Sequence, residues 1–154
     1  MKKRVLLPIV ATIALIANPT LKAEELADYV GFIPTGPAIT ADCVTAAQKM
    51  WGDAVVAIGE AEGEEAAKLA EEAARTAYAF DLGPIQFKPT LAHEDPFRED
   101  IEGAISYFVS GNEKYEEDSG FALKPWSNVR FDNHTVKFHG NIAIAMGHYY
   151  FTGP

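Results

Sequence analysis

The sequence predicts an α+β domain in which three helices cover one face of an antiparallel sheet. Two observations lead to this prediction. Between residues 42 and 79, apolar side chains recur at steps of three and four, which is the spacing of amphipathic helices. The last third of the chain, Phe121–Pro154, is rich in aromatic and β-branched residues separated by turn residues, as strands are. Helices that precede the strands, instead of alternating with them, are typical of α+β domains.

The first helix is expected to follow an N-cap at Asp42 or Thr40 and to run to about Ala61. Its apolar side chains fall on one stripe, and they include Trp51, Val55 and Ile58. Three further elements are expected before the sheet: a helix at Glu64–Ala79, a short strand at Ile85–Lys88 and a third helix at Pro96–Val109.

The run Asn141–Phe151 is the most strand-like part of the sequence. Residues two apart share a face of a strand. One face carries Ile142, Ile144, Met146, His148 and Tyr150. The other face carries Ala143, Ala145, Gly147, Tyr149 and Phe151. Both faces are largely apolar, which predicts a central strand covered on both sides. Turns are expected at Asp132-Asn133 and at Gly140-Asn141, so that the sheet is a meander.

Residues 1–23 have the layout of a secretory signal peptide, with a basic start, an apolar core and Ala23 before the cleavage point. The apolar run Val5–Ala17 is shorter than the ~20 residues that span a bilayer. We therefore expect a periplasmic or secreted protein without a stable membrane anchor after cleavage. Residues 24–41 are expected to be a lead-in segment, and residues 42–154 a single domain.

The mature chain is expected to be strongly acidic. All 22 acidic residues follow Ala23, but four of the 13 basic residues precede it, so nine bases remain and the net charge is −13. This charge argues against nucleic acid as a partner. Cys43 is the only cysteine, which excludes an intramolecular disulfide.

Three segments resemble a known family: YAFD at Tyr78–Asp81, GAISYF at Gly103–Phe108 and GNIAIAMG at Gly140–Gly147. On these segments the chain, from Asp42 to Phe151, resembles the nuclear transport factor 2-like superfamily, and its SnoaL-like and kinase-association-domain-like bacterial members in particular. The resemblance implies a cone-shaped domain with a curved sheet, a ligand pocket between sheet and helices, and a homodimer formed through the sheet.

The sequence departs from that family in two places. The steroid-isomerase members carry an aspartate on the early strand, but this chain has Gln86, Phe87 and Lys88 there, so their base chemistry is not expected. The family's sheet normally continues into one more long strand, and this sequence stops at Pro154. We therefore expect a C-terminally truncated domain whose strand Asn141–Phe151 has one unpaired, aggregation-prone edge.

An apolar ligand pocket is the first candidate site, although the same aromatic residues would also suit an ordinary core. Its expected lining is Trp51, Val55, Tyr107, Trp126, Met146, His148 and Tyr150. If His148 faces a cavity, its ordinary pKa near ~6.5 suits proton transfer, with Asp53 or Glu60 as the accompanying acid. No zinc motif is present, and His93-Glu94-Asp95 is the nearest approach to one, so neither a metal nor another cofactor is expected.

Three function hypotheses follow from these residues. The first is a domain that binds a small apolar or cyclic ligand without an assignable reaction. The second is an oligomerisation or interaction domain that uses the sheet. The third is an isomerase or a cyclohydrolase-like hydrolase of a cyclic substrate, with His148 and an acid as proton carriers.

Overall fold

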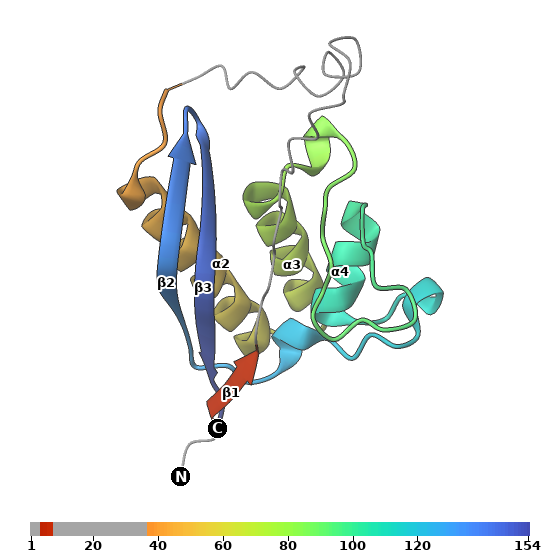
Figure 1. The fold of residues 1–154 in the computed structure, drawn as a ribbon. Helices are drawn as coiled ribbons and strands as arrows, with labels where there is room; N and C mark the ends of the chain where they lie inside the picture. Colours follow the sequence, from red (N-terminus) through yellow and green to blue (C-terminus); the bar gives the residue numbers. More distant parts are fainter. Residues whose placement is uncertain (1–3, 8–36) are drawn as a thin grey trace.

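The structure is a computed structural model, and it describes residues 4–7 and 37–154. The predicted α+β class is confirmed, since three α-helices in the described part pack beside an antiparallel sheet (Figure 1). The helices are α2 (Ala41–Glu60), α3 (Gly63–Ala77) and α4 (Ile101–Val109). The strands are β1 (Arg4–Leu7), β2 (Asn128–His139) and β3 (Ile142–Thr152). Most of the predicted signal peptide and lead-in lies outside the described residues.

The helices form where the apolar periodicity predicts them. Thr40 caps α2 by accepting a hydrogen bond from the Cys43 N–H, and Asp100 caps α4 by accepting one from the Gly103 N–H. Among the described residues, no helix is both long enough and apolar enough to cross a membrane.

The third helix begins five residues later than predicted, at Ile101 and not at Pro96. The preceding residues are extended because Arg98 donates its N–H to the Phe87 carbonyl and Glu99 accepts from the Ile85 N–H. The same two hydrogen bonds explain a second correction. Residues 85–88 do not join the sheet as a strand, but instead pair with the segment that leads into α4.

The helices lie in layers behind one face of the sheet. Helix α2 packs on β2, α3 packs against α2, and α4 packs on the far side of α3 (Figure 1). A short 3₁₀ turn, η3 (Phe121–Leu123), contacts both α2 and α4. It joins the helical layers to the start of β2.

Strands β2 and β3 pair along their whole length, from Asn128 opposite Thr152 to His139 opposite Ile142. The predicted turn at Gly140 is present, with a left-handed glycine at φ 58°. The predicted turn at Asp132-Asn133 is wrong. The strand instead continues through a bulge between Asn133 and Thr135, and the Asn133 amide exchanges two 2.8 Å hydrogen bonds with Gln48 on α2.

The sheet order is β1-β3-β2, so β3 is central over part of its length. Strand β1 pairs with Tyr149–Thr152, which corrects the expectation of an edge unpaired throughout. The prediction that β3 is covered on both faces is also wrong. Ile144 and Met146 on its outer face remain 52% and 48% exposed.

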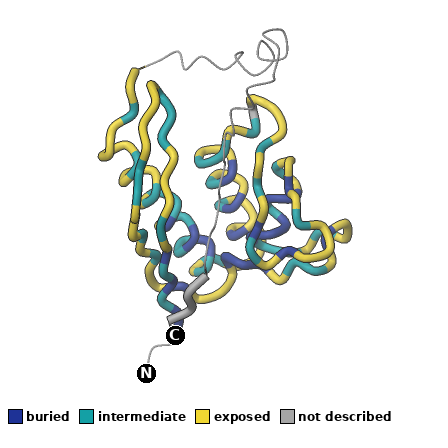
Figure 2. Tube along the Cα trace, viewed as in Figure 1, coloured by how far each residue is buried: buried dark blue, intermediate teal, exposed yellow. Residues whose placement is uncertain are grey.

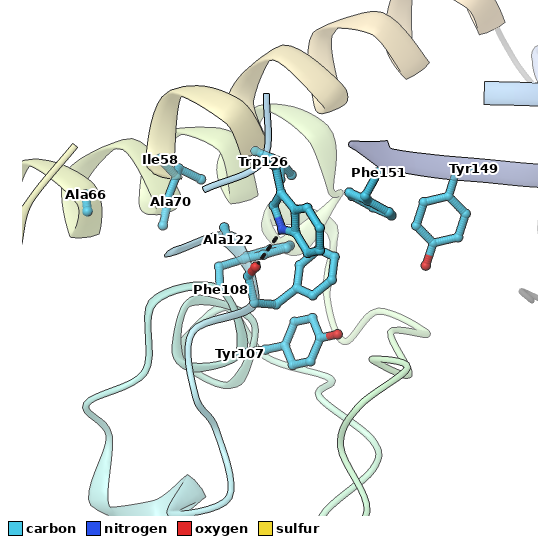
Figure 3. Close-up of a cluster of buried hydrophobic side chains, with 11 residues drawn as sticks. Ile58, Ala66, Ala70, Tyr107, Phe108, Ala122, Trp126, Tyr149 and Phe151 are labelled. Carbon is cyan, nitrogen blue, oxygen red and sulfur yellow. Dashed lines mark hydrogen bonds between the residues drawn. The ribbon is translucent and has the colours of Figure 1, made fainter. Parts of the chain in front are cut away.

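The core lies at the end of the sheet nearest the C terminus, while the hairpin end is exposed (Figure 2). Phe151 is 1% exposed and contacts the rings of Trp51, Phe121, Trp126 and Tyr149. Figure 3 shows Trp126, Tyr149 and Phe151 in this region, with the hydrogen bond that the Trp126 indole N–H donates to the Phe121 carbonyl. This hydrogen bond is 3.0 Å long.

Candidate functional site

Four side-chain hydroxyl groups gather where the inner face of the sheet meets the helices. Tyr78 follows α3, Thr90 lies in the loop before α4, Tyr107 lies on α4, and Tyr149 lies on β3. We call these four residues the hydroxyl cluster. They come from four separate elements, so only the folded chain brings them together.

Trp51 connects two members of the cluster. Its indole N–H donates a 3.0 Å hydrogen bond to the Tyr78 hydroxyl, and its ring meets the Tyr149 ring edge-on at 6.2 Å between centroids. The Tyr149 hydroxyl in turn lies 3.4 Å from the Thr90 hydroxyl, and either one can donate. One chain of contacts therefore runs from α3 through α2 and β3 to the loop.

The other side of the cluster is closed by Phe87 and Tyr107. The Phe87 ring contacts Tyr78 at 5.3 Å and Tyr107 at 5.9 Å between centroids. Leu91 follows Thr90 in the chain. A hydrogen bond from its backbone N–H to the Tyr107 hydroxyl lowers the pKa of that hydroxyl. The contacts thus form a closed ring of aromatic and hydroxyl groups.

Burial keeps the phenols protonated. It is the main cause that raises the pKa of Tyr78 to about 12, and it also raises the pKa values of Tyr107 and Tyr149. Tyr149 further raises the pKa values of Tyr78 and Tyr107, since a phenolate at Tyr149 would repel one at either position. At neutral pH the cluster therefore offers uncharged O–H donors.

Two of these donors have no acceptor among residues 37–154. The Tyr78 oxygen accepts from Trp51 and the Tyr107 oxygen accepts from Leu91, so each N–H occupies a lone pair and leaves the hydroxyl proton available. Within residues 37–154 no acceptor takes either proton. Uncharged donors in an aromatic, poorly hydrated setting suit a small anion that carries its charge on oxygen.

Metal-ligating side chains do not gather in this region. Across the described residues, no three His, Cys, Asp or Glu side chains lie together as a ligand set. The polar groups that the cluster itself presents are hydroxyls.

Comparison with known proteins gives this geometry a family. The family model described as metal-independent carbonic anhydrase matches residues 42–154, well over half of the chain. The chain belongs to this family. The metal-independent carbonic anhydrase of Nostoc sp. (strain PCC 7120) is 45% identical over 115 residues, which are 71% of this chain and 56% of that protein. The chain thus spans about half the length of this curated relative.

A solved structure agrees with the family assignment. The iota-carbonic anhydrase from a cyanobacterium, crystallised with bicarbonate, is 41% identical and superposes with a TM-score of 0.74. The match covers 79% of this chain and 78% of that one. The predicted cone-shaped α+β fold is consistent with it, and the broader superfamily resemblance stays an expectation.

The family corrects the first function hypothesis. A binding domain without an assignable reaction is wrong for a chain whose family is named for a defined reaction. The same finding removes the interaction domain and the isomerase or cyclohydrolase as interpretations of the main function. None of the sequence motifs considered above is specific to carbonic anhydrase chemistry, so this reaction could not be predicted from them.

The structure divides the seven predicted pocket residues between two faces of the sheet. Trp51, Val55, Tyr107 and Trp126 lie on the helix side, where Val55 and Trp126 are packed core residues, 2% and 8% exposed. Tyr107 is itself a member of the hydroxyl cluster, and Trp51 donates a hydrogen bond to it.

Met146, His148 and Tyr150 lie on the opposite, outer face of β3. The alternation of the strand separates them from Tyr149, and they pair across the sheet with Thr135, Asp132 and Arg130. The His148 ring lies 6.0 Å from Tyr150, which itself carries the Arg130 guanidinium at 4.2 Å. These three side chains therefore do not join Trp51 in one pocket.

Asp53 and Glu60 lie on the exposed side of α2. They line a groove of about 210 Å³ between α2 and the start of β2, and Asp53 pairs with Lys49. The groove lies on the helix side of the sheet and His148 on the outer side, so the structure does not bring His148 and either acid together as proton carriers.

Two members of the hydroxyl cluster, Tyr78 and Thr90, were not among the aromatic residues that the sequence offers for a pocket. Tyr149 belongs to that aromatic set, but the expected lining took its neighbour Tyr150, from the other face of β3. Tyr78 entered only as part of a segment that resembles a family. Thr90 lies in an irregular loop, and nothing in its local sequence distinguishes it.

An alkaline titration tests the environment of the cluster. We expect Tyr78, Tyr107 and Tyr149 to stay protonated above the ordinary tyrosine pKa of 10, up to about 12 for Tyr78. Because the folded-state pKa values are raised, this contribution to stability is full below pH 10 and is lost as the pH rises towards 12. Tyrosinate absorbance near 295 nm measures it, and Tyr78→Phe should remove one late transition. Ionisation of all six tyrosines of the folded chain near pH 10 would rule out the arrangement.

Proposed function

We propose that this chain interconverts carbon dioxide and bicarbonate at the hydroxyl cluster without a metal ion. Membership of the family and a bicarbonate-bound relative support the reaction. The observation that carries the placement is the meeting of hydroxyl groups from separate elements. The Thr90 and Tyr149 hydroxyls lie 3.4 Å apart, and the Tyr78 hydroxyl accepts from Trp51 at 3.0 Å.

The surroundings of the cluster suit both forms of the substrate. Carbon dioxide is uncharged and is compatible with the aromatic rings of Trp51, Phe87 and Phe131. When water adds to its carbon, one C=O π bond opens and negative charge develops on oxygen. The O–H protons of Tyr78 and Tyr107 are then positioned to stabilise that charge, without first reorganising as water would.

The attacking water must lose one proton as its oxygen bonds to carbon. The Thr90 and Tyr149 hydroxyls, 3.4 Å apart, can each accept one proton while giving up another. Because the pKa of Tyr149 is raised by burial, the pair passes the proton towards solvent and does not store it as phenolate. The products are bicarbonate and a proton released to the buffer, so the reaction balances.

Bicarbonate binding tests this placement. We expect the ¹³C resonance of labelled bicarbonate to broaden in the presence of the protein, and Thr90→Val to weaken the effect. Thr76→Val, an exposed position on α3, is the matched control and should behave as wild type. Equal broadening by all three proteins would place the anion elsewhere, and no broadening at any concentration would remove the proposal.

Two expectations from the sequence stay proposals. We propose export with cleavage after Ala23, which a mass spectrum of exported material starting at Met1 would contradict. Cleavage would also remove β1 from its place beside Tyr149–Thr152.

We further propose a homodimer that covers Ile144 and Met146 on the outer face of β3. Light scattering that gives a monomer at high concentration would overturn this proposal.

A further inference from the structure

A buried charged cluster lies beside the hydroxyl cluster and has no part in the reaction described above. Arg98 is completely buried, and its guanidinium donates to the Asp118 carboxylate at 2.7 and 3.2 Å. It also donates to Glu117 at 3.1 Å, and its Cζ atom lies 3.9 Å from the centroid of the Tyr115 ring. A charge removed from water in this way is costly unless it is fully paired, so these partners form one unit.

Glu117 uses its carboxylate to hold a backbone segment. One oxygen accepts from the N–H groups of His93 and Glu94, at 2.6 and 3.1 Å, and the other accepts from Asp95 at 3.0 Å. Arg98 completes the attachment by donating to the Asp95 carbonyl at 2.7 Å. The His93 and Asp95 donors are the main cause that lowers the pKa of Glu117 to about 2, so the carboxylate is charged across the range of any ordinary assay.

The segment that Glu117 holds, His93–Asp95, comes shortly after Thr90 and Leu91 in the chain. Only the buried residue Ala92 separates Leu91 from His93. On the other side, Ser106 donates to Asp118 at 2.6 Å, and Ser106 is the residue before Tyr107 on α4. Asp118 is also close enough to raise the pKa of Tyr107. The charged unit therefore connects the loop that carries Thr90 to the helix that carries Tyr107.

We propose that Glu117, Asp118 and Arg98 are positioning residues that fix the Thr90–Leu91 backbone against Tyr107 and Tyr149. The inference rests on the proposed function for its catalytic consequence. Without this attachment the loop has no regular secondary structure to hold it, and the Leu91 N–H and the Thr90 hydroxyl would lose their register with the two phenols. Displacement of reacting groups by about 1 Å can cost about 100-fold in rate.

Glu117→Gln is the decisive variant, because it keeps the shape of the side chain and removes its charge and one acceptor. Glu116→Gln is the matched control, since Glu116 is an exposed neighbour. We expect E117Q to lower kcat for carbon dioxide hydration by about tenfold or more with a smaller change in KM, and E116Q to match wild type. Glu117→Asp, which keeps the charge, should recover part of the loss.

Two measurements separate positioning from a general loss of structure. Amide exchange of the peptide containing residues 90–95 should accelerate in E117Q and not in E116Q. The ¹³Cζ resonances of labelled Tyr107 and Tyr149 should shift in E117Q, and Tyr107 should ionise at a higher pH because it loses the Leu91 donor. If E117Q does not fold, the same readouts apply to E117D, for which a smaller change in the same direction is expected.

The outcomes distinguish the two proposals. If wild type hydrates carbon dioxide and E117Q has the kcat and the tyrosine spectrum of E116Q, the positioning role is overturned. If E117Q loosens the loop while kcat and the tyrosine resonances stay unchanged, Glu117 is only a structural residue and the inference is again overturned. If wild type itself is inactive, the proposed function fails, whereas the tyrosine and exchange readouts still support or overturn the attachment of the loop to Tyr107.

Discussion

Replacing Tyr107 by phenylalanine is expected to lower kcat for carbon dioxide hydration by about 100-fold, the usual cost of removing one donor that stabilises developing charge. The substitution keeps the ring, which stacks on Phe121 at 5.5 Å and meets Phe108 at 5.8 Å. It removes only the hydroxyl group whose proton is proposed to meet bicarbonate. Stopped-flow hydration with a pH indicator measures the effect.

Tyr150→Phe is the control for this experiment. Tyr150 also lies on the sheet, next to Tyr149 in sequence, but it faces outwards under Arg130. We expect its kcat to equal that of wild type. A Tyr107→Phe protein with an unchanged melting temperature and wild-type kcat would show that the reaction, if present, takes place away from the cluster.

Replacing Phe151 by alanine is expected to destabilise the domain by about 3–5 kcal/mol, as deletion of a buried aromatic ring does. Phe151 is 1% exposed, and its ring is packed against Trp126 at 5.1 Å and Phe121 at 5.2 Å. The remaining neighbours are themselves rigid aromatic rings, which cannot collapse into the space. Urea unfolding followed by tryptophan fluorescence measures the change.

Phe138→Ala gives the matched comparison, because Phe138 lies on the same hairpin and is 45% exposed. Its substitution should cost about 1 kcal/mol or less. A loss below about 1 kcal/mol for Phe151→Ala would mean that the inner face of β3 is not the face that the helices cover.

The helices could be predicted because their signals are local. Helix α2 (Ala41–Glu60) ends one residue before the expected Ala61, and Thr40, one of the two expected caps, is its N-cap. The periodicity of Trp51, Val55 and Ile58 is sufficient for this, since all three face one layer of the fold. The start of α4 depends on a partner elsewhere in the chain, and the predicted boundary is therefore too early.

The covered face of β3 could not be predicted from alternation, because both faces are apolar. Which face of β3 is covered depends on contacts with the rest of the folded chain, and the pairing with β2 also sets local requirements. At Gly147 a Cβ atom would lie 2.2 Å from the Asp132 carbonyl oxygen, so glycine is required where the bulge presses the two strands together. The pocket prediction placed His148 with Trp51 for this reason, although the sheet lies between them.

The candidate site was only partly predictable for a related reason. Trp51 and Tyr107 are predicted because they are aromatic and lie on helices. Tyr107 belongs to the hydroxyl cluster, and Trp51 donates a hydrogen bond to it. Thr90 reaches the cluster through a loop that is held by Glu117, a residue on a separate segment beyond α4. No pattern around Thr90 indicates that long-range attachment.

The most direct test of metal-free carbon dioxide hydration is the exchange of ¹⁸O between labelled bicarbonate and water, followed by mass spectrometry. The protein is first dialysed against a chelator, and its metal content is measured in the same sample. We predict exchange well above the uncatalysed rate at a metal content far below one ion per chain, with no further increase when zinc is added. Exchange at the uncatalysed rate, or exchange that appears only after zinc is restored, would contradict metal-free hydration by this chain.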